Sequence, residues 1–525
     1  MKKYRKTIKN KYIEGYSGTT GYGEAGASHT KKSFKGFNAT SSSPNSDINY
    51  NLYDLRNRSR MLYMAGGLGT AAIKTTSTNV VGVGLIPNPQ VDFEFLGMTS
   101  EDAKAWGKKV TRYWDLWAKK KANCDIRGMS NFYGLQKVAL MGALMSGDSF
   151  ALVKRAKRTK QNPISLRLDV IEADLISTPT KLKEGKYFKC TTDGIANNGN
   201  EIFNGVEVDN NGSIVAYYVS DKYPKETILY SQETKWTRIP AYGELTNSPN
   251  ILHVCDIERG GQYRGVPFLA QVIEPLLQMR RYTESELMAA LVNSFFTAFI
   301  TTEKETNVLV DDDNNENNNP KEDELTMGPG MINQLAPGEN ISFGDPKHPN
   351  SGFDLFMMTL AKLIGASLEI PAEVILKAFN SNYSASRAAL QEAWKMFSNR
   401  RVWFVEDFCQ PTWELFVDEL VALNYISAPG YFDNPLIRQA YLNCRWNGTM
   451  QPQLDPIKEV QAEILKVENG FTTRKEATIR LNGGSFDENV SQLELENSIF
   501  QATKTDIKEE EDDKEEITND NSSKR

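Results

Sequence analysis

GVPFLAQVIEPLLQMRRYTESELMAALVNSFF, residues 265–296, is the segment from which the fold can best be inferred. Its apolar positions recur at the spacing of one helical face (Leu269, Val272, Ile273, Leu276 and Leu277). Pro267 suits a first helical turn, and Pro275 is expected to kink the helix that follows. A helix of some 30 residues would be about 45 Å long. The segment therefore predicts one long helix over residues 265–298.

The sequence that follows predicts a non-helical segment and then a second helix that could pair with the first. Residues 311–320, DDDNNENNNP, are too polar to pack and indicate a loop, with short strand-like pieces at 330–335 and 340–343. A second helix is predicted from 352 to 368, ending before Ile370-Pro371. A third begins near 382–384, and Pro411 should break or bend it before residues 413–423. Two long helices thus flank a compact excursion.

Upstream, the pattern is mixed. Helices are predicted over 54–78, 100–121 and 131–145, with a short extended piece at 79–87. β-branched runs predict strands, and Asp209-Asn210-Asn211-Gly212 is typical of a hairpin turn. The predicted strands cover 150–153, 165–171, 205–208 and 213–219. The sequence therefore indicates an α+β fold that is predominantly helical.

The two ends of the sequence read as polar tails. Residues 1–48 combine a basic start with a run rich in Gly, Ser, Thr and Asn, and are expected to be disordered. Residues 503–525 form an acidic tail, whose charge run at 508–516 we interpret as solvated. Helices beginning at Asp455-Pro456 and near Val490 precede it.

Composition excludes several classes of protein. The 525 residues carry 61 Lys and Arg against 67 Asp and Glu, a formal charge of −6, whereas proteins that grip duplex DNA usually carry a basic surplus. The cysteines are scattered without metal or redox spacing (Cys124, Cys190, Cys255, Cys409 and Cys444), which favours free thiols in a reducing compartment. No signal peptide and no membrane span are predicted.

The sequence offers little catalytic chemistry. The three histidines, His29, His253 and His348, lack metal-ligand spacing, so no metal is expected. Gly66-Gly67-Leu68-Gly69-Thr70 lacks the lysine of a phosphate loop, and Gly82-Val83-Gly84 is followed by Pro87 where a dinucleotide fingerprint needs its third glycine. We therefore expect no cofactor and no ATP-driven activity.

One pattern imitates a catalytic site. Gly147-Asp148-Ser149, together with Asp345 and His348, resembles pieces of the Gly-Asp-Ser serine hydrolases. Catalysis would require Ser149 within hydrogen-bond reach of His348, oriented by Asp345. The other glycine and asparagine blocks of that family are not apparent, so a hydrolase remains only the alternative interpretation.

Several ordered stretches resemble the lambda-type portal family of tailed bacteriophages. They begin with Leu55 to Arg60 running into Asn79 to Gly84, and continue with Arg264 to Leu269 and Glu284 to Leu287. The most specific stretch is His348-Pro349-Asn350 followed by Asn382 to Trp394, and Phe408 to Pro411 and Asp455 to Glu459 extend the match. The likeness runs from about residue 50 to 500, apart from the asparagine-rich insertion.

This resemblance implies a subunit of a ring, typically of twelve copies, with a wing, a two-helix stem, a clip and a crown. It assigns the wing to 49–264, stem helices to 265–298 and 352–369, the clip to 299–351, a tunnel loop to 370–382, a helix returning to the wing to 383–454, and the crown to 455–502. Lys377, Phe379 and Asn380 would then face DNA in the tunnel loop, unless they only connect two helices. Clip residues Glu303, Lys304, Asp311, Asp312 and Lys321 would dock partners.

The implied function is structural rather than enzymatic. The ring would stand at one capsid vertex of the virion, assembled in the host bacterial cytoplasm, and would conduct double-stranded DNA without sequence specificity. Its implied partners are the terminase large subunit, the head–tail adaptor, and the major capsid and scaffold proteins. Another structural phage protein, a capsid or adaptor subunit, is a further alternative, although paired long helices argue against a capsid shell.

Overall fold

The computed structural model describes ten stretches of the chain. They are residues 26–28, 31–37, 39–179, 193–223, 234–294, 298–302, 339–343, 352–379, 383–451 and 455–501. Over these residues the protein is predominantly helical with four small antiparallel sheets, which confirms the predicted α+β class.

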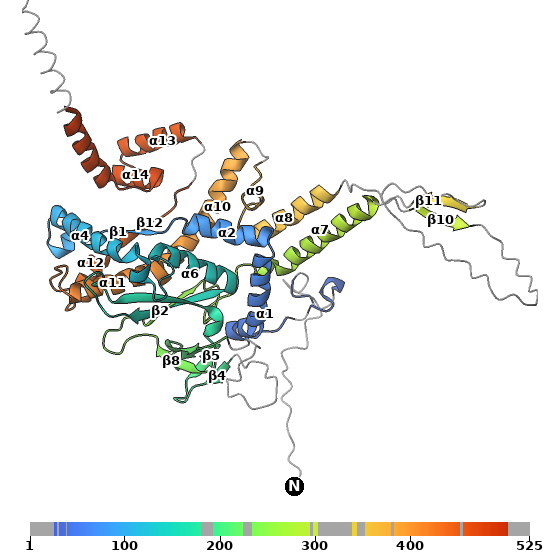
Figure 1. The fold of residues 1–525 in the computed structure, drawn as a ribbon, viewed down its shortest axis with the longest axis horizontal. Helices are drawn as coiled ribbons and strands as arrows, with labels where there is room; N and C mark the ends of the chain where they lie inside the picture. The colour runs from blue at the N-terminus through green and yellow to red at the C-terminus, as the bar shows by residue number, and fades with distance from the viewer. Residues whose placement is uncertain are drawn as a thin grey trace, which may run out of the picture.

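The body of the molecule is a helical layer over a three-stranded sheet (Figure 1). The sheet has the order β3-β2-β9, and a second sheet of order β4-β5-β6-β7-β8 lies beside it. The strands are β2 (Asp148–Arg155), β3 (Leu166–Glu172), β9 (Ile251–Cys255), β4 (Asp193–Ile195), β5 (Glu201–Phe203), β6 (Val206–Val208), β7 (Ile214–Ser220) and β8 (Trp236–Pro240). The predicted turn joins β6 to β7, where the Asp209 carboxylate accepts hydrogen bonds from the backbone N–H groups of Asn211 and Ser213.

The helices of the body pack on the three-stranded sheet and on one another. They are α1 (Pro44–Met64), α2 (Leu68–Val80), α3 (Phe93–Leu96), α4 (Ser100–Ala118), α5 (Lys121–Cys124), α6 (Phe132–Ser146), α11 (Gln410–Ala422) and α12 (Pro435–Leu442), with the 3-10 turn η3 (Ala173–Leu175). A further 3-10 turn, η2 (Lys32–Phe34), precedes α1. A two-stranded sheet pairs β1 (Ile86–Pro89) with β12 (Cys444–Asn447). It ties the N-terminal third of the chain to a segment more than 350 residues later.

Aromatic side chains form the centre of the main core. Trp114 of α4 is fully buried, and four rings surround it with centroid distances of 4.9 to 5.3 Å: those of Trp117, Phe132, Trp413 and Phe416. Such tilted and edge-to-face pairs add about 0.5–1.5 kcal/mol each to the burial of apolar area. The core therefore locks α4, α6 and α11 together.

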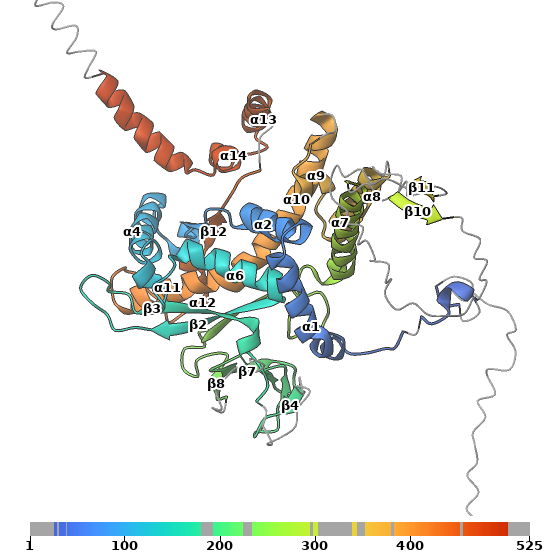
Figure 2. The same ribbon diagram turned by 45° about the vertical axis from the view of Figure 1, so that its right-hand side comes forward.

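A pair of helices, α7 (Ile273–Ser294) and α8 (Phe353–Ser367), projects from this body (Figures 1 and 2). The strands β10 (Ala298–Thr302) and β11 (Glu339–Phe343) pair antiparallel beyond its far end. The strand predicted at 340–343 is thus present, whereas the piece predicted at 330–335 lies outside the described residues. Tyr282 holds the pair together by stacking on Phe353, at 5.6 Å between ring centroids, and by meeting Phe356 edge-on at 4.9 Å.

The first projecting helix starts later than predicted. Residues 265–269 are irregular, the 3-10 turn η4 covers Ala270–Val272, and α7 begins at Ile273. Pro275 therefore lies in the first turn, where backbone N–H groups have no partner within the helix. The expected mid-helix kink does not arise, because no internal hydrogen bond is lost there.

Two further helix boundaries differ from the prediction. The helix predicted over 54–78 is interrupted, because Gly66 and Gly67 take positive φ angles of 84° and 78°, which separates α1 from α2. The first helix begins at Pro44, with Ser43 as its N-cap, so the last residues of the predicted disordered arm 1–48 are helical. The Asn45 side chain donates to the Gly261 carbonyl, which anchors this first turn to the body.

Pro411 does not break the third long helix. The chain is helical from α10 (Tyr383–Phe404) through a π-helical segment, η5 (Val405–Cys409), into α11. Proline has no N–H and its ring clashes with the carbonyl of residue i−4 in a regular α-helix. The wider turn immediately before Pro411 provides room for the ring, as inserted π segments do in other helices.

The C-terminal helices form a small module on the side of the body opposite the β4–β8 sheet (Figure 1). It contains α13 (Pro456–Glu468), α14 (Arg474–Asn482) and a helical stretch over residues 486–501. Exposed ion pairs connect it to the body: Arg445 with Glu476 at 2.7 Å, and Lys104 of α4 with Asp487 at 3.0 Å.

Candidate functional site

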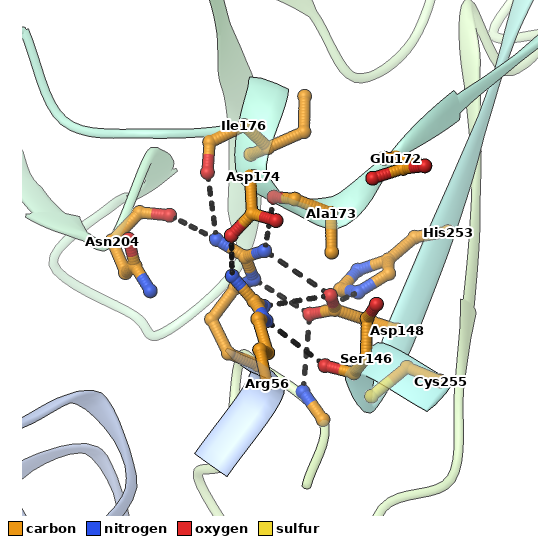
Figure 3. A network of polar contacts seen from close by, with 12 residues as sticks. Arg56, Ser146, Asp148, Glu172, Ala173, Asp174, Ile176, Asn204, His253 and Cys255 are labelled. Atoms are coloured by element: carbon orange, nitrogen blue, oxygen red, sulfur yellow. Dashed lines mark hydrogen bonds and ion pairs between the residues drawn. The ribbon is translucent and has the colours of Figure 1, made fainter. Parts of the chain in front are cut away.

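Residues from several separate parts of the chain surround one buried carboxylate, that of Asp148 (Figure 3). Asp148 follows Gly147 at the junction of α6 and β2, and its side chain is fully buried. Its Oδ1 accepts from Arg56 Nη2 at 2.9 Å and from Arg264 Nη2 at 3.1 Å. Its Oδ2 accepts from Arg264 Nε at 2.6 Å and from the backbone N–H of Gly265 at 3.1 Å.

Arg264 uses every guanidinium nitrogen in this cluster. Besides Asp148, it donates to the carbonyls of Ile176 at 3.0 Å, Ala173 at 2.9 Å, and Asn204. Its side chain has no exposed area. A buried charge is tolerable only when it is paired and hydrogen-bonded, and this guanidinium meets both conditions.

A second acidic residue balances the charge. Asp174 of η3 forms ion pairs with Arg56 at 3.5 Å and with Arg60. Burial lowers the pKa of Arg56 to about 10, helped by the neighbouring charge of Arg264 and opposed by Asp148. That value keeps Arg56 protonated at neutral pH. Glu172 lies 3.8 Å from Arg60, so three carboxylates face the three arginines of the cluster.

Burial would by itself raise the pKa of Asp148, but the charges of Arg264 and Arg56 outweigh it and hold that pKa well below its usual range. His253 of β9 lies nearby, with Nε2 3.7 Å from Asp148 Oδ2, and burial lowers its pKa despite the attraction of Asp148. Its imidazole stacks on Phe150 at 4.3 Å between ring centroids. The histidine is therefore a neutral packing partner at pH 7.

The surroundings of Ser149 do not favour a hydrolase. Ser149 is only 2% exposed, within β2, and α6 passes over its hydroxyl at Gly142. The neighbouring carboxylate, Asp148, already accepts four hydrogen bonds from Arg56, Arg264 and the Gly265 N–H. Asp345 and His348 lie outside the described residues. Among the described residues, no group of His, Cys, Asp and Glu side chains could hold a metal ion.

The predicted tunnel loop 370–382 contains a short helix. α8 ends at Ser367, Glu369 takes a positive φ of 57°, and α9 (Ala372–Leu376) follows Pro371. Buried Val374 and Ile375 fix α9 against the body, since α9 packs on α2, α8 and α10.

α9 ends at Lys377, one of the three predicted tunnel residues. Lys377 is the left-handed C-cap of α9 with a φ of 55°, and its side chain is exposed. Phe379 is 47% exposed, an unusual state for a phenylalanine beside a packed helix. Asn380 lies outside the described residues. The structure thus brings Lys377 and Phe379 to one exposed segment on an anchored base.

The clip residues that the sequence suggested cannot be placed in the same way. Glu303, Lys304, Asp311, Asp312 and Lys321 lie outside the described residues, which include only the flanking strands β10 and β11 of that region.

The projecting pair α7–α8 has exposed apolar side chains. Three side chains of α7 and three of α8 are at least half exposed: Leu287 at 62%, Met288 at 60%, Leu291 at 53%, Leu355 at 73%, Phe356 at 50% and Leu363 at 58%. Several exposed apolar side chains on two paired helices are typical of a contact surface in a soluble protein. We call these six residues the stem surface. None of the described helices is both long and apolar enough to cross a bilayer.

Comparison with known proteins places this architecture in context. A family model described as "Phage portal protein, lambda family" matches residues 30–401, which include α1 to α9 and most of α10. "Portal protein B" of Escherichia phage lambda is 22% identical over 430 residues, covering 78% of this chain and 76% of that protein. The "Portal protein" of Escherichia phage N15 is 22% identical over 471 residues, covering 84% and 83%.

A solved structure also aligns. A chain in the "Virion of native gene transfer agent (GTA) particle" is 12% identical with a TM-score of 0.43, covering 83% of this chain and 94% of that one.

Proposed function

Because the chain belongs to the lambda family of phage portal proteins, we propose that its subunits form a closed ring at one capsid vertex, around a channel for double-stranded DNA. The expected number of copies is twelve. The ring is a component of the virion, assembled in the cytoplasm of the host bacterium, and conducts DNA in packaging and in ejection.

The stem surface is the observation that carries this proposal. A single subunit leaves Leu287, Met288 and Leu355 in water, although each gains on the order of 1.5–3 kcal/mol when fully buried. Head-to-tail contacts that close into a ring cover such a surface once in every subunit, with no free end. The α7–α8 pair projects from the body and is therefore accessible to neighbours on both sides (Figure 2).

Within the ring we place the exposed segment after α9 beside DNA. Lys377 supplies a positive charge on a fixed base, and Phe379 and Asn380 complete the segment. One cation and one ring per subunit contact a phosphate backbone weakly, which suits DNA that must keep moving. The overall charge of −6 fits the same requirement, since each tight phosphate contact would have to be broken as DNA advances.

The ring acts passively in this proposal. No phosphate loop occurs in the sequence, so a separate terminase motor supplies the work. The clip residues Glu303, Lys304, Asp311, Asp312 and Lys321 dock the terminase large subunit first and the head–tail adaptor later. The outer wing meets the major capsid and scaffold proteins during assembly. The protein has no catalytic role of its own.

Electron microscopy of the purified protein tests the central claim. We expect rings with an open axis and subunits that project stem helices toward one end. A monodisperse compact particle without a central hole, at protein concentrations in the micromolar range, would refute the proposal. Robust DNA-stimulated ATP hydrolysis by pure rings would refute its passive part.

A further inference from the structure

The wing has a strongly basic surface, although the whole chain is acidic. Residues 104–167 contain fifteen Lys and Arg and only three Asp and Glu. Lys104, Lys108 and Arg112 follow one another at four-residue intervals along α4, so they share one side of the helix. Lys109 and the pair Lys120 and Lys121 extend the charge, and all six side chains are exposed. We call these six residues the basic face.

Most of this charge has no acidic partner within the described residues. Lys104 pairs with Asp487, and the adjacent Lys119 pairs with Asp115 at 2.8 Å. None of the ion pairs between described residues involves Lys109, Arg112, Lys120 or Lys121. Lys108 acts on Asp487 only through its charge, which helps to lower the pKa of that carboxyl. The basic face lies on α4 and α5, at the end of the body away from α7 and α8 (Figures 1 and 2). It therefore takes no part in the stem surface.

The C-terminal part of the chain has the complementary charge. Residues 481–503 contain four acidic residues and no Lys or Arg, and residues 506–516 add eight acidic residues against two lysines. One residue of this part of the chain, Asp487, contacts the basic face, since its carboxylate lies 3.0 Å from the amine of Lys104. The same carboxylate lies 3.8 Å from Lys475. The acidic sequence continues from this contact.

The length of chain allows the contact to continue. The helical stretch 486–501 begins beside α4 and is about 24 Å long at 1.5 Å per residue. From residue 501 to residue 509 the chain spans up to about 26 Å, at roughly 3.3 Å per residue. The acidic residues can therefore return to the basic face from which the helix departs.

We propose that the acidic segment 506–516, which lies outside the described residues, binds the basic face of α4 and α5 and extends the contact that Asp487 makes with Lys104. A tethered segment acts at an effective concentration in the millimolar range. The bound segment then keeps phosphate groups off the wing, so that DNA is held neither before nor during its passage. In this proposal the acidic segment is bound to its own subunit and is not a solvated tail.

Zero-length carbodiimide coupling of intact rings tests the contact directly, because it joins carboxylates to lysine amines only when they touch. We expect the carboxylates of 509–516 to couple to Lys108, Lys109, Lys120 and Lys121 several times more often than to Lys74 and Lys235, which are exposed on other elements. The preference should disappear in 1 M salt, where charges are screened beyond about 3 Å. Equal coupling to both groups of lysines would overturn the proposal.

Binding of a short DNA duplex gives an independent readout. In one variant the seven carboxylates of residues 509–516 are neutralised (Glu509→Gln, Glu510→Gln, Glu511→Gln, Asp512→Asn, Asp513→Asn, Glu515→Gln and Glu516→Gln). At low salt this variant should bind the duplex about tenfold more tightly than the unmodified ring, and a free peptide of residues 502–525 should reverse the gain. Adding Lys108→Gln and Arg112→Gln should abolish it, whereas Lys74→Gln with Lys235→Gln should not.

Two results of the duplex assay would overturn the proposal. One is unchanged duplex affinity after neutralisation. The other is that the unmodified ring binds the duplex through the basic face and the free peptide does not compete. That result would identify DNA as the partner of the basic face. Electron microscopy of each variant separates these results from a failure to form rings.

Discussion

Replacing Asp148 with asparagine removes one negative charge from the centre of the buried cluster and keeps the shape of the side chain. Each carboxylate oxygen accepts two hydrogen bonds, from Arg56 and Arg264 on one side and from Arg264 and Gly265 on the other. An amide has a single oxygen, so two donors would face an NH₂ group. The two buried guanidinium groups would also lose their shared counter-ion.

The expected cost follows from this geometry. Hydrogen bonds to charged groups contribute about 1.5–3 kcal/mol each, and removing one partner of a buried ion pair costs about 3–5 kcal/mol. Since these terms overlap, we expect the free energy of unfolding to fall by about 4 kcal/mol. That is a large part of the roughly 5–15 kcal/mol that stabilises a typical folded domain.

Glu207→Gln is the matched control. Glu207 is as fully buried as Asp148, but its partner Arg238 has a side chain that is 42% exposed and can be hydrated when the pair is lost. We expect a loss of about 1–2 kcal/mol for this change. Urea denaturation at pH 7, followed by tryptophan fluorescence at one fixed protein concentration, measures both variants, because assembly adds to apparent stability. If Asp148→Asn costs no more than Glu207→Gln, the cluster does not hold the body together.

The lowered pKa of Asp148 also predicts how the stability lost in Asp148→Asn depends on pH. Because the pKa of Asp148 is depressed in the folded protein, its charge contributes full stability above the unfolded pKa of about 3.8. That contribution is lost as pH falls toward the folded pKa. The difference between the unmodified protein and Asp148→Asn should therefore be constant from pH 8 to pH 5 and should shrink only below about pH 4.

Three further predictions concern other parts of the molecule. Burial raises the pKa of Asp407 to about 6, so its ionisation lowers the free energy of unfolding, and the full loss is reached above that pH. Asp407→Asn should therefore stabilise the protein by about 2 kcal/mol at pH 8 and by little at pH 4, as measured by urea denaturation at these two pH values. No gain at pH 8 would contradict this. The double variant Leu287→Glu with Leu355→Glu should form no rings in electron microscopy, while the melting temperature of the body stays unchanged. Ile195→Glu, a change at a similarly exposed position in β4, should preserve the rings. Intact rings in the double variant would exclude the stem surface as the contact between subunits. Replacing 376–381 with a glycine–serine linker should preserve rings but change DNA packaging or retention in a complementation assay, and unaltered packaging would mean that Lys377 and Phe379 only connect helices.

Periodicity was sufficient to predict the two projecting helices, because apolar residues at this spacing form one continuous face only when the chain is helical. It was insufficient at their ends. α7 starts eight residues after Gly265, because that glycine packs on the backbone of Gly147, where an added Cβ would lie 1.9 Å from the carbonyl oxygen. A contact between residues more than a hundred positions apart leaves no local pattern. The interruption at Gly66 and Gly67 did have a local signal, in two adjacent glycines inside a helical pattern.

The Asp148 cluster was missed for a similar reason. Its members come from α1, β2, η3, β9 and the segment before α7, and no spacing in the sequence relates them. In the sequence, Asp148 stands out only as part of an apparent Gly-Asp-Ser motif. A lone carboxylate between an apolar helix and an apolar strand was itself a signal, since such a group must find a cationic partner when buried. The arginines Arg56 and Arg60 were available candidates.

Part of the resemblance to portal proteins rests on residues that the structure buries, and this has a physical cause. Arg264 donates hydrogen bonds from all its guanidinium nitrogens and Gly265 has no room for a Cβ, so few other residues could occupy either position. Lys377 and Phe379, in contrast, are exposed on a base fixed by Val374 and Ile375, so packing does not restrict their side chains. At Arg264 and Gly265 the scaffold therefore restricts the residue type, whereas the segment that we propose to face DNA can vary without disturbing the scaffold. Exchanging the segment after α9 on an unchanged scaffold should therefore alter DNA passage independently of ring assembly.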